Sequence, residues 1–64
     1  MKITMTSGGA LTLPGCLARF GADLGIISPE YELTHLIRRG RLFRVTGPAG
    51  SRREDVGIID RIEV

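Results

Sequence analysis

The segment SPEYELTHLIRRG, residues 28–40, contains the strongest local signals of the chain. Ser28 is a favoured N-cap residue, and Pro29 is tolerated at the first position of a helix. Gly40 is the residue type that most often follows the last turn of a helix. The apolar residues between these signals follow a spacing of three and four: Leu33, Leu36 and Ile37. The segment therefore predicts an amphipathic helix with these side chains on its inner side.

The charges of the same segment agree with a helix. Glu30 and Glu32 would lie near the positive end of the helix dipole, and Arg38 and Arg39 near its negative end. A period of 3.6 places the following residues on the outer side: Tyr31, Glu32, His35, Arg38 and Arg39. We expect this outer side to face solvent or a partner.

Two elements are expected before this segment. MKITMT, residues 1–6, alternates apolar and polar side chains, as a half-buried strand does. LTLPGCLARFGADLG, residues 11–25, predicts a second helix, with Thr12 as its cap and Gly25 as its stop. Its apolar stripe consists of Leu13, Leu17, Phe20 and Leu24. The helices 11–25 and 28–40 would then be about three residues apart.

The remaining residues predict two strands and a loop. RLFRVT (41–46) and VGIIDRIEV (56–64) are rich in β-branched residues, whereas GPAGSRRED (47–55) is typical of a long hairpin loop. We therefore expect one small α+β domain over residues 1–64, in the order strand, helix, helix, strand, loop, strand, with a short antiparallel sheet. The expected core consists of Ile3, Leu17, Phe20, Leu24, Ile26, Leu33, Leu36, Ile37, Phe43, Val45, Ile58 and Ile62.

Arginine dominates the second half of this 64-residue chain, although its net charge is only +2. Six arginines precede the next acid, Glu54: Arg38, Arg39, Arg41, Arg44, Arg52 and Arg53. The planar guanidinium group matches phosphates and the edges of bases. The alternative is a solvated basic surface whose arginines pair with Glu30, Glu32, Glu54 or Asp60.

The order of these elements resembles a winged helix-turn-helix domain. The resemblance in sequence lies in FGADLGIISPEYELTHLIRRGRLFRV and in VTGPAGSRREDVGI. It implies that Pro29–Arg39 is a recognition helix for double-stranded DNA. The implied DNA-contacting residues are Tyr31, His35, Arg38 and Arg39 on this helix, Arg41 and Arg44 after it, and Arg52 and Arg53 at the tip of the wing.

These observations favour a small DNA-binding protein, such as a transcriptional regulator or an accessory factor, which could act as a homodimer. The alternative is a protein-binding inhibitor or adaptor of the phage or mobile-element type, docking its arginine surface or the edge strand expected at residues 56–64 on a partner. A homo-oligomer without a ligand is a third possibility. No catalytic pair or triad is visible, and one cysteine and one histidine do not make a zinc site. We therefore expect no enzyme, no metal and no cofactor.

The sequence has no continuous apolar run of the length that a membrane span needs, and residues 1–13 do not look like a signal peptide. A single cysteine is typical of proteins from reducing compartments. We expect a cytoplasmic protein that does not insert into membranes.

Overall fold

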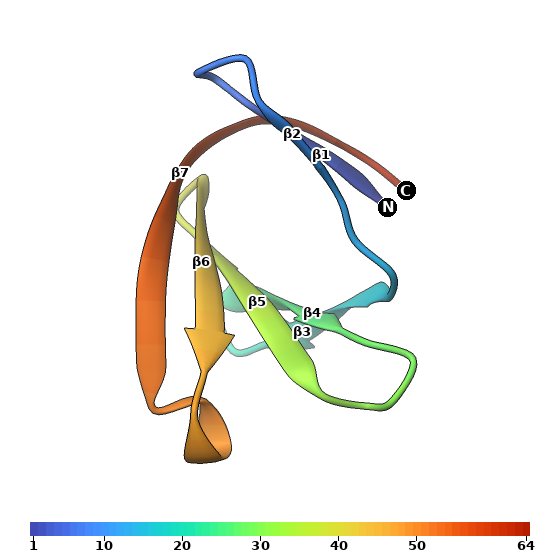
Figure 1. Cartoon of the computed structure of the whole chain (residues 1–64), viewed down its shortest axis with the longest axis vertical. Helices are drawn as coiled ribbons and strands as arrows, with labels where there is room; N and C mark the ends of the chain where they lie inside the picture. Colours follow the sequence, from blue (N-terminus) through green and yellow to red (C-terminus); the bar gives the residue numbers. More distant parts are fainter.

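The computed structural model describes all residues from 1 to 64 and is almost entirely β-structure (Figure 1). Seven strands and one short 3₁₀ turn follow one another along the chain: β1 (Lys2–Met5), β2 (Ala10–Thr12), β3 (Cys16–Phe20), β4 (Asp23–Ile27), β5 (Leu33–Arg38), β6 (Arg41–Thr46), η1 (Pro48–Gly50) and β7 (Arg52–Glu63). The structure contains no α-helix.

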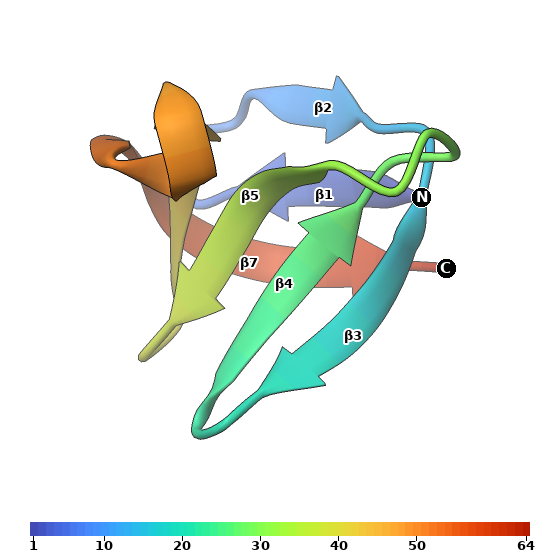
Figure 2. The same cartoon turned by 90° about the horizontal axis from the view of Figure 1, so that it is seen from below.

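The strands form one antiparallel sheet in the order β2-β1-β7-β6-β5-β4-β3. Strand β7 is 12 residues long and pairs with β6 through its first half and with β1 through its second half. It curves strongly between the two halves, so the sheet folds over on itself (Figures 1 and 2). The result resembles a partly open barrel whose two edge strands are β2 and β3.

Register shifts accompany this curvature. The β6–β7 register shifts between Leu42 and Phe43, and the β1–β7 register between Thr4 and Met5. Bulges of this kind bend a strand and increase its twist. Gly57 lies between the two shifts with a φ of 136°, a conformation that favours glycine. The sequence of β7 therefore supplies the bend that brings β1 back against β4 and β5.

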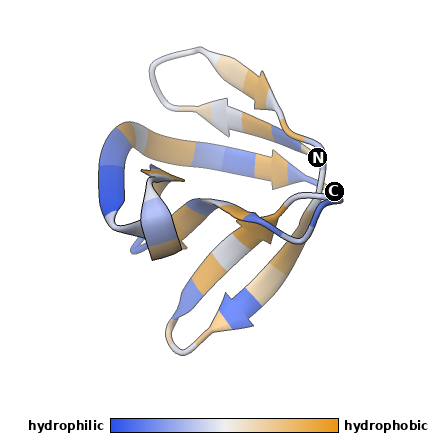
Figure 3. Cartoon of the chain, turned by 60° about the horizontal axis from the view of Figure 1, so that its bottom comes forward, coloured by the Kyte–Doolittle hydropathy of each residue, from blue (hydrophilic) through white to orange (hydrophobic).

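The core lies on the inner side of the curved sheet. Five buried side chains form it: Ile3, Met5, Ile26, Ile37 and Leu42. Partly buried apolar residues from both parts of the sheet surround them, including Leu11, Leu17, Leu24, Ile59 and Ile62. Figure 3 shows apolar colour along most strands and hydrophilic colour at the beginning of β7. Every strand thus contributes at least one apolar side chain to the interior.

A second apolar layer covers part of the outer side. Leu36 and Val45 are each only 6% exposed, yet they do not belong to the inner cluster. Leu36 lies opposite Gly25 in the β4–β5 register. A Cβ atom on Gly25 would lie 2.5 Å from the ring of Phe20 and 2.8 Å from Leu33 Cδ1, so these two side chains pack over the glycine. Strands β4 to β6 are therefore apolar on both faces.

The winged helix-turn-helix expectation is wrong, and so is the α+β fold class, because neither expected helix exists. Residues 28–40 form a turn, then β5, then a tight turn into β6. The hydroxyl of Ser28 accepts a hydrogen bond from the Glu32 amide at 3.3 Å, as a cap would, but it closes a loop. There is no recognition helix from Pro29 to Arg39.

The expected helix at residues 11–25 is replaced by β2, β3 and the first part of β4. Gly15 explains much of this difference. Its φ is 138°, and a Cβ atom there would lie 2.2 Å from the carbonyl oxygen of Ile27. Gly21 has a φ of 60° in the turn between β3 and β4. The glycines that would weaken a helix are thus required by turns and by close contact between strands.

The expected wing, a long loop over residues 47–55, is also wrong. The connection after β6 is only residues 47–51 and contains the η1 turn, and Arg52 to Asp55 belong to β7. By contrast, the expected strands at 41–46 and 56–64 correspond to β6 and to most of β7, and the first strand corresponds to β1. The expectation that residues 56–64 form an edge strand is wrong, because β7 lies between β1 and β6.

The expected core is partly confirmed. Its buried members are Ile3, Ile26, Leu36, Ile37 and Val45. Phe20 and Ile58 were expected inside but are 47% and 48% exposed. Met5 and Leu42 are buried and were not expected to be. The structure has no helix that could serve as a membrane span.

Candidate nucleic-acid interface

Three of the six arginines lie at the tip of the β5–β6 hairpin. Arg38 and Arg41 lie directly opposite each other, and the two residues between them, Arg39 and Gly40, have φ values of 51° and 76°. Two successive positive φ values are the signature of the type I′ turn that joins hairpin strands. The sequence Arg-Arg-Gly-Arg therefore forms a tight turn with three guanidinium groups.

Like charges directly opposite each other destabilise a sheet, and acids from neighbouring strands relieve this repulsion. Arg38 Nε lies 3.7 Å from Asp23 Oδ1 on β4, and Arg41 Nε lies 3.1 Å from Asp55 Oδ2 on β7. Arg39, at the turn itself, has no carboxylate within 4.0 Å. At the tip of the hairpin, Arg38 and Arg41 are thus compensated, that is, paired with a carboxylate, whereas Arg39 is uncompensated.

Arg44 lies on the inner side of the sheet, two residues from the buried Leu42. Its Nη2 donates a hydrogen bond to Glu54 Oε2 at 2.5 Å, across the β6–β7 pair. It is the third arginine that is matched by an acid. His35 lies directly opposite Arg44 on β5.

Arg52 and Arg53 begin β7 and lie opposite Thr46 and Val45. Successive residues of a strand point to opposite faces, so the two guanidinium groups leave the sheet on different sides. Neither has a carboxylate within 4.0 Å. The six arginines therefore divide into three that are paired with acids and three that are not.

Tyr31 is separate from the tip of the arginine hairpin. It lies in the loop between β4 and β5, is 91% exposed and has a φ of 63°. This loop is at the beginning of β5, whereas Arg38 is at its end. The residues that were expected on one outer face, from Tyr31 to Arg39, are therefore spread over both ends and both faces of β5.

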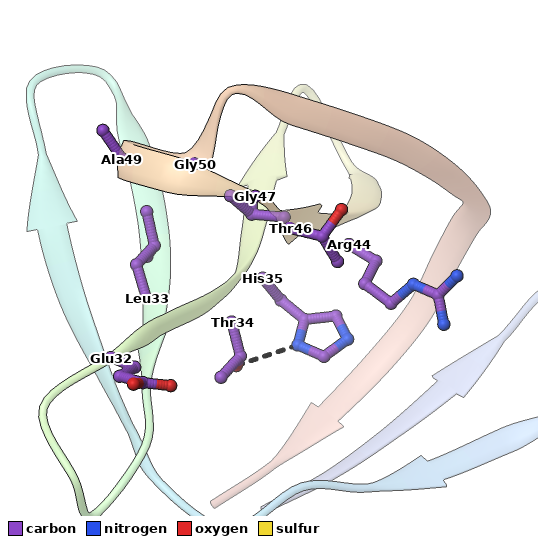
Figure 4. A pocket seen from close by; sticks show the side chains of 10 residues that line it. Glu32, Leu33, Thr34, His35, Arg44, Thr46, Gly47, Ala49 and Gly50 are labelled. Atoms are coloured by element: carbon purple, nitrogen blue, oxygen red, sulfur yellow. Dashed lines mark hydrogen bonds between the residues drawn. The ribbon is translucent and has the colours of Figure 1, made fainter.

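His35 lines a hollow at the end of the sheet where Tyr31 is found. The hollow has a volume of about 740 Å³ and is bounded by the first residues of β5, the last residues of β6 and the turn at residues 47–50 (Figure 4). The hydroxyl of Thr34 donates a hydrogen bond to the carbonyl oxygen of Ile26 at 3.2 Å, and it lies 3.0 Å from His35 Nδ1. Thr34 thereby fixes the orientation of the imidazole ring.

The environment of His35 disfavours its charged form. Burial lowers the pKa of His35 below 6.5, and the positive charge of Arg44 lowers it further. A second hollow on the other side of His35 is lined by residues of β2, β5, β6 and β7, among them Glu54 and Asp55. Together with Glu32 in the first hollow, these are the other ionisable groups around His35. At neutral pH the imidazole is therefore uncharged, and it can accept one hydrogen bond and donate another.

Sequence reasoning found the arginines and named Glu54 among their possible partners, but it missed Asp23 and Asp55. Asp55 and Glu54 are 14 and 10 residues away from Arg41 and Arg44, and only the β6–β7 register brings them together. The signal was present in the chain, because RLFR is followed by RRED within a hairpin. Thr34, which orients His35, was missed as well. No group of three His, Cys, Asp or Glu side chains is arranged to hold a metal ion.

Comparisons with known protein families, with curated proteins and with solved structures found no match to this chain.

Proposed function

We propose that the protein binds nucleic acid through the phosphate backbone, using arginines at the two ends of β6. The observation that carries this proposal is the division of the arginines. Arg39 lies at one end of β6, and Arg52 and Arg53 lie beside the other end, and all three lack an acid partner. An uncompensated guanidinium group at a protein surface is suited to a phosphate.

The spacing of the two ends supports a backbone contact. Strand β6 has six residues, so it spans about 17 Å at about 3.4 Å per residue. Phosphates along one strand of B-form DNA rise by about 3.4 Å per nucleotide. The two groups of arginines could therefore contact phosphates about five nucleotides apart on one strand, or phosphates on both sides of a groove.

Fluorescence anisotropy tests this proposal. A labelled random-sequence duplex and a single strand of equal length would be titrated with the protein at low and at physiological salt. We expect binding that weakens as salt increases, since phosphate contacts release counterions. Arg39→Ala should weaken binding by about eightfold at 0.1 M salt, which corresponds to the loss of one phosphate contact.

Arg61→Ala is the matched control. Arg61 is an exposed arginine near the far end of β7, and its Nε is 3.5 Å from Glu63 Oε1. Its substitution removes the same charge but no uncompensated arginine. An equal loss of affinity for Arg39→Ala and Arg61→Ala would contradict the proposed site. An absence of binding at low salt would refute the function.

A second candidate function is the binding of an extended peptide from a partner protein. It is favoured by β3, which pairs only with β4 and leaves the other side of its backbone free. The exposed ring of Phe20 at the end of β3 adds an apolar contact. A peptide could extend the sheet at this edge. In that case the amides of β3 should gain protection from hydrogen exchange in the complex, and Arg39→Ala should leave the affinity unchanged.

A further inference from the structure

The hollow beside His35 contains hydrogen-bonding groups that no contact within the protein uses. Because the hydroxyl hydrogen of Thr34 is donated to Ile26, its oxygen accepts from His35 Nδ1. The neutral imidazole then carries its hydrogen on Nδ1, and Nε2 is left as an acceptor with no partner. Figure 4 shows the second ring nitrogen of His35 pointing away from Thr34.

Arg44 supplies a donor on the neighbouring strand. It lies directly opposite His35, and such pairs have Cβ atoms about 4.5–5.5 Å apart. Nη2 is held by Glu54, whereas Nε and Nη1 make no hydrogen bond within the chain. The two residues therefore present one acceptor and one donor side by side. This arrangement complements the adjacent donor and acceptor atoms on the edge of a nucleobase.

The charges around the hollow favour a neutral group over a phosphate. The charge of Arg44 is matched by Glu54, His35 is uncharged, and Glu32 adds a negative charge to the lining. A free anion bound at this place would meet no uncompensated positive charge inside the hollow. Leu33, Val45 and Ala49 contribute apolar contact surface to the lining.

The rim, in contrast, carries an uncompensated charge. Arg52 Cγ lies 3.7 Å from the position that a Cβ atom would take on Gly47, a residue of the hollow. The aliphatic part of the Arg52 side chain therefore lies beside the edge of the hollow, and its guanidinium group has no acid partner. A neutral interior beside a basic rim matches a nucleotide, whose base is neutral and whose phosphate is not.

We propose that this hollow binds one unstacked base of a single-stranded nucleic acid, with His35 Nε2 accepting from the base, Arg44 donating to it, and Arg52 contacting the adjacent phosphate. This inference rests on the function proposed above and makes it more specific, because a base inside a duplex does not expose its pairing edge. All the bases have neighbouring donor and acceptor atoms, so little sequence preference is expected.

The test compares two single strands with the same number of phosphates. One is a labelled oligothymidylate, and the other is an abasic oligonucleotide of equal length. We expect the wild-type protein to bind the oligothymidylate about fivefold more tightly, the lower end of the range for a base held by two hydrogen bonds. His35→Leu should abolish this difference while leaving the affinity for the abasic strand unchanged. His35→Gln, which retains an acceptor, should keep part of the difference.

The outcomes separate this inference from the function on which it rests. Equal binding of the two strands by the wild-type protein would overturn the base site and leave phosphate binding intact. No binding of either strand would refute both. Arg39→Ala should weaken both strands by the same factor, because Arg39 is at the opposite end of β6 from the hollow. A loss confined to the oligothymidylate in Arg39→Ala would also contradict the assignment.

Discussion

The exchange of Asp55 for Asn tests whether ion pairs with acids prevent some of the arginines from binding phosphate. Asp55 Oδ2 is 3.1 Å from Arg41 Nε, and both side chains are about half exposed. In Asp55→Asn, Arg41 becomes a fourth uncompensated arginine beside Arg39, Arg52 and Arg53. The amide has nearly the size of the carboxylate, so the fold should remain the same.

The salt dependence of binding gives the magnitude. The logarithm of the binding constant for B-form DNA falls with the logarithm of salt concentration with a slope of about −0.9 for each phosphate contact. Three contacting arginines predict a slope of about −2.7, and therefore about a 40-fold loss between 50 and 200 mM salt. Six contacting arginines would predict a slope of about −5.4 and a loss of about 1,800-fold. Asp55→Asn should change the slope to about −3.6 and tighten binding about eightfold at 0.1 M salt.

Fluorescence anisotropy at several salt concentrations measures these slopes. Asp60→Asn is the control, because Asp60 is an exposed residue of the same strand and pairs with no arginine. It changes the net charge equally without releasing Arg41. A wild-type slope close to −5.4 would show that ion pairing does not silence the arginines. Equal effects of Asp55→Asn and Asp60→Asn would show that total charge alone matters, and either result would refute the reasoning.

Three expectations concern stability. Leu42 is fully buried, so Leu42→Ala should lower the free energy of unfolding by about 2–5 kcal/mol. Ile58 is about half exposed, so Ile58→Ala should lower it by less than about 1 kcal/mol. Urea denaturation measures both changes. Gly15→Ala should destabilise more than Gly25→Ala, because its methyl group would meet a backbone carbonyl oxygen at a φ of 138°, whereas that of Gly25→Ala meets only side chains; equal losses in the same denaturation assay would contradict this. The pKa of His35 is lowered in the folded protein, so the contribution of the neutral imidazole to stability should be complete above pH 6.5 and decrease as pH falls. The free energy of unfolding should therefore fall between about pH 7.5 and 5.5. This fall should be smaller in His35→Gln.

Two strands could be predicted from the sequence with nearly correct bounds, β1 and β6. Strand β1 alternates apolar and polar residues, which is the period of a strand with one buried face. Strand β6 is buried on both faces, and it was recognised by its β-branched and aromatic residues between two turns. Their bounds agree with the structure almost residue for residue.

The segment at residues 28–40 imitates a helix for a physical reason. Leu36 and Ile37 point to opposite faces of β5, and both are buried because the sheet is covered on its inner and outer sides. A register shift then places Leu33, rather than Thr34, opposite Ile27. Two-sided burial and a bulge together produce apolar positions spaced by three and four, which are also the spacing of one helical face.

The residues at the two ends of the same segment, Ser28 and Gly40, do what was expected of capping residues, but they do it in turns and not at the ends of a helix. Ser28 does accept a hydrogen bond from a backbone amide, and Gly40 does adopt a positive φ. Both features close turns, the first before β5 and the second after it. Capping residues report that the chain changes direction, but they do not report which element lies between the changes. Only the strand partners decide this, and they come from other parts of the chain.

The pairing of the charges, like the choice between helix and strand, depends on residues that are distant in the sequence. The arginines cluster along the sequence, but their neutralisation depends on the acids that the sheet register brings beside them, Asp23, Glu54 and Asp55. These acids pair with Arg38, Arg44 and Arg41, and they leave Arg39, Arg52 and Arg53 without a partner. A net charge of +2 therefore understates the local field at Arg39 and at the start of β7. Since phosphates respond to charges within about a Debye length, about 8 Å at physiological salt, the local distribution rather than the total decides whether this small sheet holds a nucleic acid.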